Sequence, residues 1–274
     1  MVLVDKILIT NVLNEIVLMN SDITGMFNPK TEKMEKVDKK KFHPCFSIQN
    51  QIDKEMTCLE IWDHLFGIIE ANVPKTIKSK VMIITHGHKL GKLMPLPKYE
   101  GNRIGFGNLF TFKINIENGA LGDISVIHNP IEQETIYNHE KIYLTSDNNF
   151  YIKNIDTTAI SKALRDYKNL NTTIILIRHS KALHNGTELL YENIYDPPLV
   201  NDGIESAHSL GRKLKENEEI DENIHILPIC SELNRTLTTF HHICHGAKIS
   251  FSDELSKYLS ELDKIGETIK KNLK

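Results

Sequence analysis

The chain has 274 residues, of which 40% are hydrophobic and 25% are charged, and its formal net charge is −3. This composition is typical of a globular protein with a buried core, so it excludes disordered, collagen-like and coiled-coil chains. The small negative charge gives no reason to expect binding to nucleic acid or to an anionic membrane, and no apolar run approaches the roughly 18 residues of a membrane span.

The cysteines and the N-terminal segment indicate in which cellular compartment the protein is expected. The first residues, Met1-Val-Leu-Val-Asp-Lys6, lack the basic-then-apolar pattern of a secretory signal. The cysteines are scattered and suggest reduced thiols rather than a disulfide framework: Cys45, Cys58, Cys230 and Cys244. Both features favour a cytoplasmic protein.

In the first half of the chain, apolar runs alternate with polar segments. Strands are predicted over residues 6–18, 80–85, 108–117 and 123–127, the last two as a hairpin with Gly119 and Gly122 in its turn. Residues 52–71 carry apolar side chains at helical spacing and stop before Pro74, so they predict an amphipathic helix. Residues 20–50 are polar, and their Lys/Glu-rich stretch from Lys30 to Lys41 predicts a solvated loop.

The second half alternates predicted strands with predicted helices. Residues 129–155 are polar and irregular, and they are the best candidate for a linker. Buried strands are predicted over 172–177 and 224–229, and helices over 157–168, 202–216, 234–244 and 253–272. Strands that alternate with helices predict an α/β fold with a mainly parallel sheet.

Three of the predicted strands run into cationic or imidazole side chains. These side chains are His86, Arg178 with His179, and Arg235. Because ligands bind at the carboxyl ends of parallel strands, neighbouring strands would bring these groups to one place. Guanidinium groups bind phosphoryl oxygens through paired N–H donors, and a neutral imidazole can attack phosphorus. The pattern favours phosphoryl transfer, although a single histidine after a strand is more often structural.

Residues 172–240 carry three spaced motifs that resemble the histidine phosphatase superfamily, which has the phosphoglycerate-mutase-like fold. The motifs are Arg178-His179-Ser180 followed by Asn185, then Asp196-Pro197-Pro198-Leu199 before Gly203, then Ser231-Glu232-Leu233-Asn234-Arg235-Thr236. The resemblance implies a three-layer α/β sandwich, with a mainly parallel central sheet and helices on both faces.

Elements of the family's second half resemble the start of this chain instead of its end. Thr85-His86-Gly87 resembles the family's second histidine motif, and residues 7–15 resemble its acid-bearing segment, with Glu15 in the acid position. The resemblance therefore implies one circularly permuted domain over residues 1–274. In it, residues 1–128 correspond to the family's C-terminal half, 129–170 form the linker, and 171–274 correspond to the N-terminal half. A domain-swapped dimer and a fusion of two decayed copies are the alternatives.

The function implied by the resemblance is hydrolysis of a phosphate monoester, small or carried on a protein, through a phosphohistidine. His179 would be the nucleophile, and Arg178, Arg235, His86 and Asn185 would bind the phosphoryl group. Glu15 would be the proton donor, with Glu254 as its rival. The resemblance implies no cofactor and no metal, and it leaves a homodimer open.

Two alternatives to a phosphatase follow from the motifs. Ser180 replaces the family's glycine and Glu232 replaces its proline, which leaves open a weakly active or inactive relative that binds phosphorylated ligands or proteins. A phosphoglycerate-type mutase uses the same residues, but nothing in the sequence indicates the closed substrate pocket that a mutase needs.

A metal site is a separate hypothesis. Residues with metal-binding side chains gather in one predicted helix: His241, His242, Cys244 and His245. His241 and His245 are four residues apart, a spacing that can bind zinc. A polar helix end in a chain with 13 histidines is the preferred interpretation.

Overall fold

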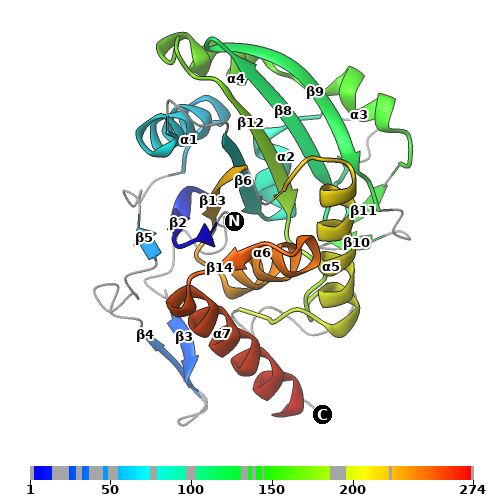
Figure 1. The fold of residues 1–274 in the computed structure, drawn as a ribbon. Coiled ribbons are helices and arrows are strands. Elements are labelled where there is room, and N and C mark those ends of the chain that lie inside the picture. The colour runs from blue at the N-terminus through cyan, green and yellow to red at the C-terminus, as the bar shows by residue number, and fades with distance from the viewer. Residues whose placement is uncertain are drawn as a thin grey trace.

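The structure is a computed structural model of the chain (Figure 1). It describes residues 3–13, 25–28, 33–36, 46–48, 55–74, 79–96, 103–130, 135–137, 140–143, 145–185, 196–221 and 224–272. Among these residues, no helix combines the length and the apolar character needed to traverse a membrane.

A seven-stranded sheet runs through the centre of the molecule in the order β5-β2-β13-β6-β12-β8-β9 (Figure 1). Its strands are β2 (Ile7–Ile9), β5 (Phe46–Ile48), β6 (Ser79–Thr85), β8 (Thr111–Glu117), β9 (Ala120–His128), β12 (Thr172–Arg178) and β13 (His225–Cys230). The strands from β5 to β12 pair in parallel, whereas β8 and β9 are antiparallel. The prediction of a mainly parallel sheet is confirmed.

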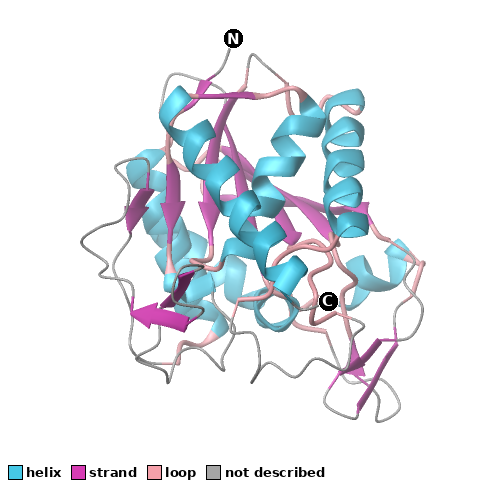
Figure 2. Cartoon of the chain, turned by 90° about the horizontal axis from the view of Figure 1, so that it is seen from below, coloured by secondary structure: helices cyan, strands magenta, loops and turns pink. Residues whose placement is uncertain are grey.

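Helices cover both faces of this sheet (Figure 2). One face carries α1 (Cys58–Asn72), α2 (Gly87–Leu93), α3 (Asn148–Asn154) and α4 (Thr158–Ala163), and the other carries α5 (Asn201–Glu216), α6 (Asn234–Ala247) and α7 (Asp253–Asn272). Side chains alternate between the two cores along each central strand: in β6, Val81 and Ile83 join the first core, and Met82 and Ile84 join the second. The three-layer α/β fold is confirmed.

Helices α5, α6 and α7 begin within one residue of their predicted starts, whereas the helix predicted over 52–71 begins only at Cys58, and α2 and α3 were not predicted. Thr57 caps α1 with a capping box, in which its hydroxyl accepts from the Glu60 amide and the Glu60 carboxylate accepts from the Thr57 amide. The helix predicted over 157–168 is α4 followed by a single 3₁₀ turn, Leu164–Asp166. The predicted hairpin is β8–β9, and Gly119, with a φ of 70°, lies in its turn, while Gly122 lies inside β9.

Two predictions for the N-terminal part hold only in part. Within the loop expected over Lys30–Lys41, residues 33–36 form strand β4 (Lys33–Lys36), which pairs with β3 (Gly25–Asn28), and the rest of that stretch lies outside the described residues. The polar region 20–50 also contains β5 of the central sheet. The strand expected at the start of residues 6–18 is β2, which ends at Ile9; Asn11–Leu13 then form a 3₁₀ turn, and residues 14–18 lie outside the described residues. The Thr10 hydroxyl accepts from the Val12 amide at 3.3 Å, and such local bonds compete with strand pairing.

The irregular segment expected over 129–155 is also wrong in part. It contains β10 (Thr135–Tyr137), β11 (Glu140–Tyr143) and α3, and β11 pairs with β7 (Arg103–Ile104). Asp147 caps α3 by accepting from the Asn149 amide at 2.9 Å, and Tyr151 of α3 is buried in the first core. The connection over 129–170 is therefore partly folded against the sheet.

Helices α5 and α6 approach each other closely because glycine lies at their contact. A Cβ added at Gly211 of α5 would lie 2.0 Å from the Ile243 carbonyl oxygen of α6, and one added at Gly246 of α6 would lie 2.1 Å from the His208 carbonyl oxygen. No side chain fits into such a gap. This contact fixes the position of α6, which carries Arg235.

Gly211→Ala should destabilise the protein by about 1–3 kcal/mol, because the added methyl group forces the two helices apart. Gly91→Ala in α2 is the matched control, since the atom nearest to its added Cβ is 4.0 Å away. That control should be neutral or stabilising by up to about 1 kcal/mol. Urea unfolding of both variants measures the difference, and equal stabilities would contradict the close contact.

Candidate active site

The carboxyl ends of three neighbouring strands meet at one edge of the sheet. In the register, Thr85 of β6 pairs with Arg178 of β12, and Ile84 of β6 pairs with Cys230 of β13. The next residues stay linked beyond the strands, because the His179 amide donates to the Thr85 carbonyl at 2.8 Å and the Ser231 amide donates to the Ile84 carbonyl at 3.2 Å. His86, His179 and Ser231 therefore start from adjacent backbone positions.

The imidazoles of His86 and His179 lie together, with ring centroids 5.1 Å apart. Neither residue is exposed. A third imidazole, that of His184, lies 5.8 Å from the His179 ring. The expectation that segments far apart in the chain would bring two histidines to one place is met by this geometry.

The hydrogen bonding of His179 determines which ring nitrogen carries the proton. Its Nδ1 lies 2.6 Å from the Ser180 carbonyl oxygen, and a carbonyl can only accept, so Nδ1 carries the hydrogen. In the neutral ring the lone pair is then on Nε2, which is buried and has no hydrogen-bond partner in the described part of the chain. Burial, Arg235 and Arg178 lower the pKa of His179 well below its usual value. The ring is a neutral base with a free Nε2 lone pair.

The other two imidazoles are kept neutral by the same surroundings. Burial, followed by the charge of Arg235, lowers the pKa of His86 well below its usual value. Its Nε2 lies 2.7 Å from the Ser231 hydroxyl. Burial lowers the pKa of His184 to about 2, and Arg235 and Arg178 act in the same direction. The positive charge of the site is therefore carried by the two arginines.

Arg235 and Arg178 reach the site from different elements. Arg235 lies in the first turn of α6, is fully buried, and places Nη1 3.3 Å from Oδ1 of Asp196. Asp196 also accepts from the Asn234 amide at 2.7 Å. Burial raises the pKa of the Asp196 carboxyl, while Arg235 and the amides at the start of α6 oppose this shift. The half-buried Arg178 donates to the Phe106 carbonyl.

A glycine, Gly87, follows His86 because the Arg178 side chain lies close to this position. A Cβ at this position would lie 3.0 Å from Nε of Arg178, closer than side chains ordinarily pack. An added Cβ would therefore require the Arg178 side chain to shift by a few tenths of an ångström.

Two threonines of α6 connect the segments of the site. The Thr239 hydroxyl accepts from the Ser180 amide at 3.0 Å and donates to the Arg235 carbonyl at 2.6 Å. The Thr236 hydroxyl lies 2.9 Å from the Ser231 carbonyl oxygen, to which it donates. These bonds connect the turn after β12, the start of α6 and the turn after β13.

The other residues that the motifs singled out are Asn185, Ser180 and the two candidate acids, Glu15 and Glu254. Asn185 lies in the turn after β12, where its Oδ1 accepts from the Ala182 amide at 3.0 Å. The Ser180 hydroxyl donates to the Gly203 carbonyl at 2.6 Å, so it is turned towards α5. Glu15 lies outside the described residues, and its rival Glu254 is exposed at the start of α7.

The motifs contain three contributors that sequence reasoning left without a role. They are His184, Ser231 and Asp196. Each stands in or next to a motif residue, which was the available signal. Their roles depend on contacts between separate segments, and no spacing rule predicts such contacts.

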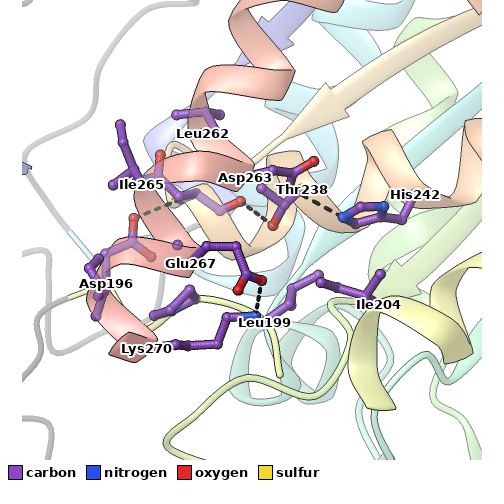
Figure 3. A pocket seen from close by; sticks show the side chains of 14 residues that line it. Asp196, Leu199, Ile204, Thr238, His242, Leu262, Asp263, Ile265, Glu267 and Lys270 are labelled. Carbon is purple, nitrogen blue, oxygen red and sulfur yellow. Dashed lines mark hydrogen bonds and ion pairs between the residues drawn. The ribbon is translucent and has the colours of Figure 1, made fainter. Parts of the chain in front are cut away.

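A cavity of about 240 Å³, drawn with its lining side chains in Figure 3, does not include His86, His179 or Arg235. It is lined by the segment before α5 and by residues of α5, α6 and α7, and among the groups described above it includes Asp196 and Asn234. His86, His179 and Arg235 are fully buried.

A comparison with models of known protein families gives a match for part of this chain. Residues 174–263 match the model of the histidine phosphatase superfamily (branch 1). The matched segment contains His179 and Arg235, but it does not reach β6 or His86. Comparisons with curated proteins and with solved structures give no significant match.

Thr239→Val should destabilise the protein by about 1–3 kcal/mol, because it leaves the buried Ser180 amide without its acceptor. Thr238→Val is the matched control in the same helix, since the Thr238 hydroxyl donates only to the Asn234 carbonyl one turn back among its described bonds. Urea unfolding should show a much smaller loss for the control. Equal losses would mean that Thr239 does not link the two elements.

Proposed function

We propose that this protein is a phosphatase that hydrolyses a phosphate monoester through a phosphohistidine on Nε2 of His179. The observation that carries the proposal is the state of His179: its Nδ1 is held by a carbonyl, and its Nε2 has no hydrogen-bond partner among the described residues. Arg178 and Arg235 both lower its pKa, so two cations act on the same ring. The superfamily match over residues 174–263 supports the same reaction class.

The first chemical step forms a bond between Nε2 of His179 and phosphorus. The bond between phosphorus and the ester oxygen breaks, and the leaving oxygen takes a proton from a carboxylic acid, for which Glu15 stays the candidate. Arg178 and Arg235 bind the nonbridging oxygens and stabilise the charge that develops on them. His86 adds a hydrogen bond to the phosphoryl group.

The second step returns the enzyme to its starting state. Water attacks phosphorus, the bond between phosphorus and Nε2 breaks, and inorganic phosphate leaves. The acid that protonated the leaving group now accepts a proton from the water. The bond from Nδ1 to the Ser180 carbonyl keeps the imidazole oriented through both steps.

His179→Ala should reduce turnover of p-nitrophenyl phosphate by more than about 1,000-fold, because no other side chain replaces the nucleophile. His128→Ala, in β9, is the control and should keep most of the activity. Rapid quenching of the wild type with a ³²P-labelled substrate should trap an acid-labile, alkali-stable label on His179.

Other outcomes would favour the alternative functions. Absence of turnover, together with phosphopeptide binding that Arg235→Ala abolishes, would indicate a non-catalytic relative. Phosphoryl transfer between two positions of one substrate, with little release of phosphate, would indicate a mutase.

We also propose that the chain is a single permuted domain. His86 comes from residues 1–128 and His179 from residues 171–274, yet their rings lie 5.1 Å apart. Strand β6, from the first of these parts, lies between β12 and β13 of the second. One chain therefore supplies both halves of the site, which favours permutation over a domain-swapped dimer.

Mixing two inactive variants tests the permutation. A single domain that contains both histidines predicts that His86→Ala and His179→Ala stay inactive after joint refolding, because every chain lacks one group. Recovery of about a quarter of the wild-type sites, as random pairing of swapped chains would give, would overturn it. The phosphatase assay with wild-type protein refolded alone is the control.

A further inference from the structure

Outside the candidate active site, four imidazoles and one carboxylate gather where α5, α6 and α7 meet. His208 comes from α5, His241, His242 and His245 come from α6, and Asp263 comes from α7. The rings form a continuous group, with the His241 and His245 centroids 4.6 Å apart and those of His208 and His242 5.0 Å apart. The phosphatase mechanism uses none of them.

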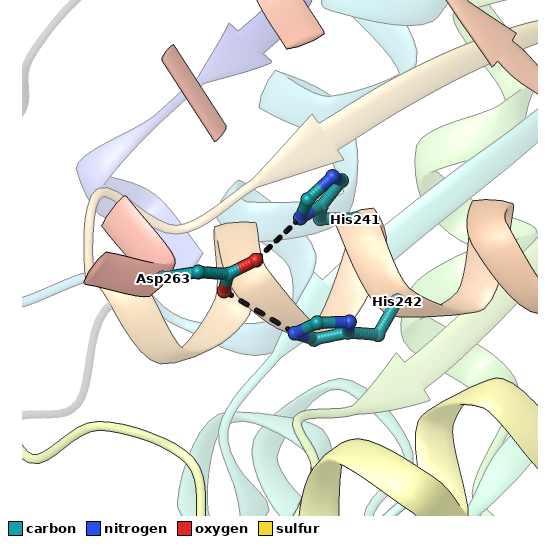
Figure 4. A group of neighbouring side chains, drawn as sticks. All are labelled: His241, His242 and Asp263. Carbon is teal, nitrogen blue, oxygen red and sulfur yellow. Dashed lines mark hydrogen bonds and ion pairs between the residues drawn. The ribbon is translucent and has the colours of Figure 1, made fainter. Parts of the chain in front are cut away.

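Three of these residues direct their polar atoms at one another (Figure 4). Nδ1 of His241 lies 2.9 Å from Oδ2 of Asp263, and Nε2 of His242 lies 3.2 Å from Oδ1 of the same carboxylate. One ligand atom from each residue can be chosen so that all three lie within 4.8 Å of one another. In a tetrahedral zinc site, neighbouring ligand atoms are about 3.3 Å apart, as metal–ligand distances of about 2.0–2.1 Å require.

We propose that His241, His242 and Asp263 form a zinc-binding site. Two imidazole nitrogens and one carboxylate oxygen are ligands that suit Zn²⁺ and other borderline divalent ions. From the sequence, a polar helix end was the preferred interpretation, since the chain has 13 histidines. The third ligand comes from α7, and no sequence pattern connects the two helices.

The surroundings of His242 are those of a metal ligand. Its second ring nitrogen, Nδ1, lies 3.0 Å from Nε2 of His208. When Nε2 of His242 binds a metal, Nδ1 carries the hydrogen and donates to His208, which orients the ring. His241 is 4% exposed and His242 is 9% exposed, so packing restricts both rings before any metal arrives.

A metal ion can enter this site and retain an open coordination position. His242 and Asp263 both line the cavity beside the candidate active site (Figure 3). A water molecule or a small anion in that cavity would complete the tetrahedron. Cys244 is not part of the site, because it is buried in the apolar core.

The expected consequence of binding is a link between two helices. α7 contributes one ligand and α6 contributes two, so zinc would hold α7 against α6. Because zinc binds only the folded arrangement, it would raise the melting temperature in a concentration-dependent way. This effect does not depend on phosphatase activity.

Titration of the metal-free full-length protein with ZnCl₂ tests the proposal. Calorimetry should show one ion per chain, and the melting temperature should rise with free zinc. His241→Ala and Asp263→Asn should each weaken zinc binding by at least about tenfold. Asp263→Asn retains polar atoms for the two imidazoles, so it guards against loss of binding through misfolding, and far-UV circular dichroism of both variants without zinc checks their folding.

A control variant distinguishes zinc binding at this site from zinc binding at the imidazoles of the candidate active site. His179→Ala removes an imidazole of the candidate active site and should bind zinc as the wild type does. If zinc binding persists in His241→Ala and Asp263→Asn but is lost in His179→Ala, the ion binds at the active site and the proposal is wrong. Absence of stoichiometric binding to the wild-type protein would also overturn it.

Discussion

The parallel pairing of β13, β6 and β12 is the constraint on which the candidate site depends. Each of these strands is apolar on both faces, so the sheet is stable only between two helical layers. In this register, three strands that come from distant parts of the chain end side by side. Since a shift of one residue would exchange the two faces of a strand, burial on both sides fixes the register. The positions of His86 and His179 are a consequence of that packing.

Burial gives this site both its chemistry and its energetic cost. Without water, imidazoles beside guanidinium groups release their protons, which makes His179 a neutral base. A buried guanidinium is costly unless it is paired, and Asp196 supplies that partner for Arg235. Asp196 also accepts from the amide at the start of α6, so one carboxylate stabilises both the cation and the helix that carries it. The aspartate of the Asp-Pro-Pro-Leu motif therefore has a structural explanation.

The features that sequence reasoning predicted are those that local patterns encode. Continuous apolar runs predicted β6 and β12, and the strand-end histidines pointed to one edge of the sheet. Strand β4 lies in the Lys/Glu-rich stretch that was assigned to a loop, because its Lys and Glu residues lack the apolar alternation of a half-buried strand. Contacts such as Asp196 with Arg235, or Asp263 with His241, join segments that only the tertiary fold brings together.

Helix α6 carries residues of both the candidate active site and the proposed zinc site. Arg235 lies in its first turn, and His241 follows six residues later, about 9 Å along the axis. The glycine contact with α5 prevents α6 from moving sideways, and the Thr239 hydroxyl fixes its start to the turn that follows β12. A helix restrained in this way moves as a rigid body or not at all. Packing of α7 against α6 therefore helps to hold the α6 backbone that carries Arg235 at the candidate active site.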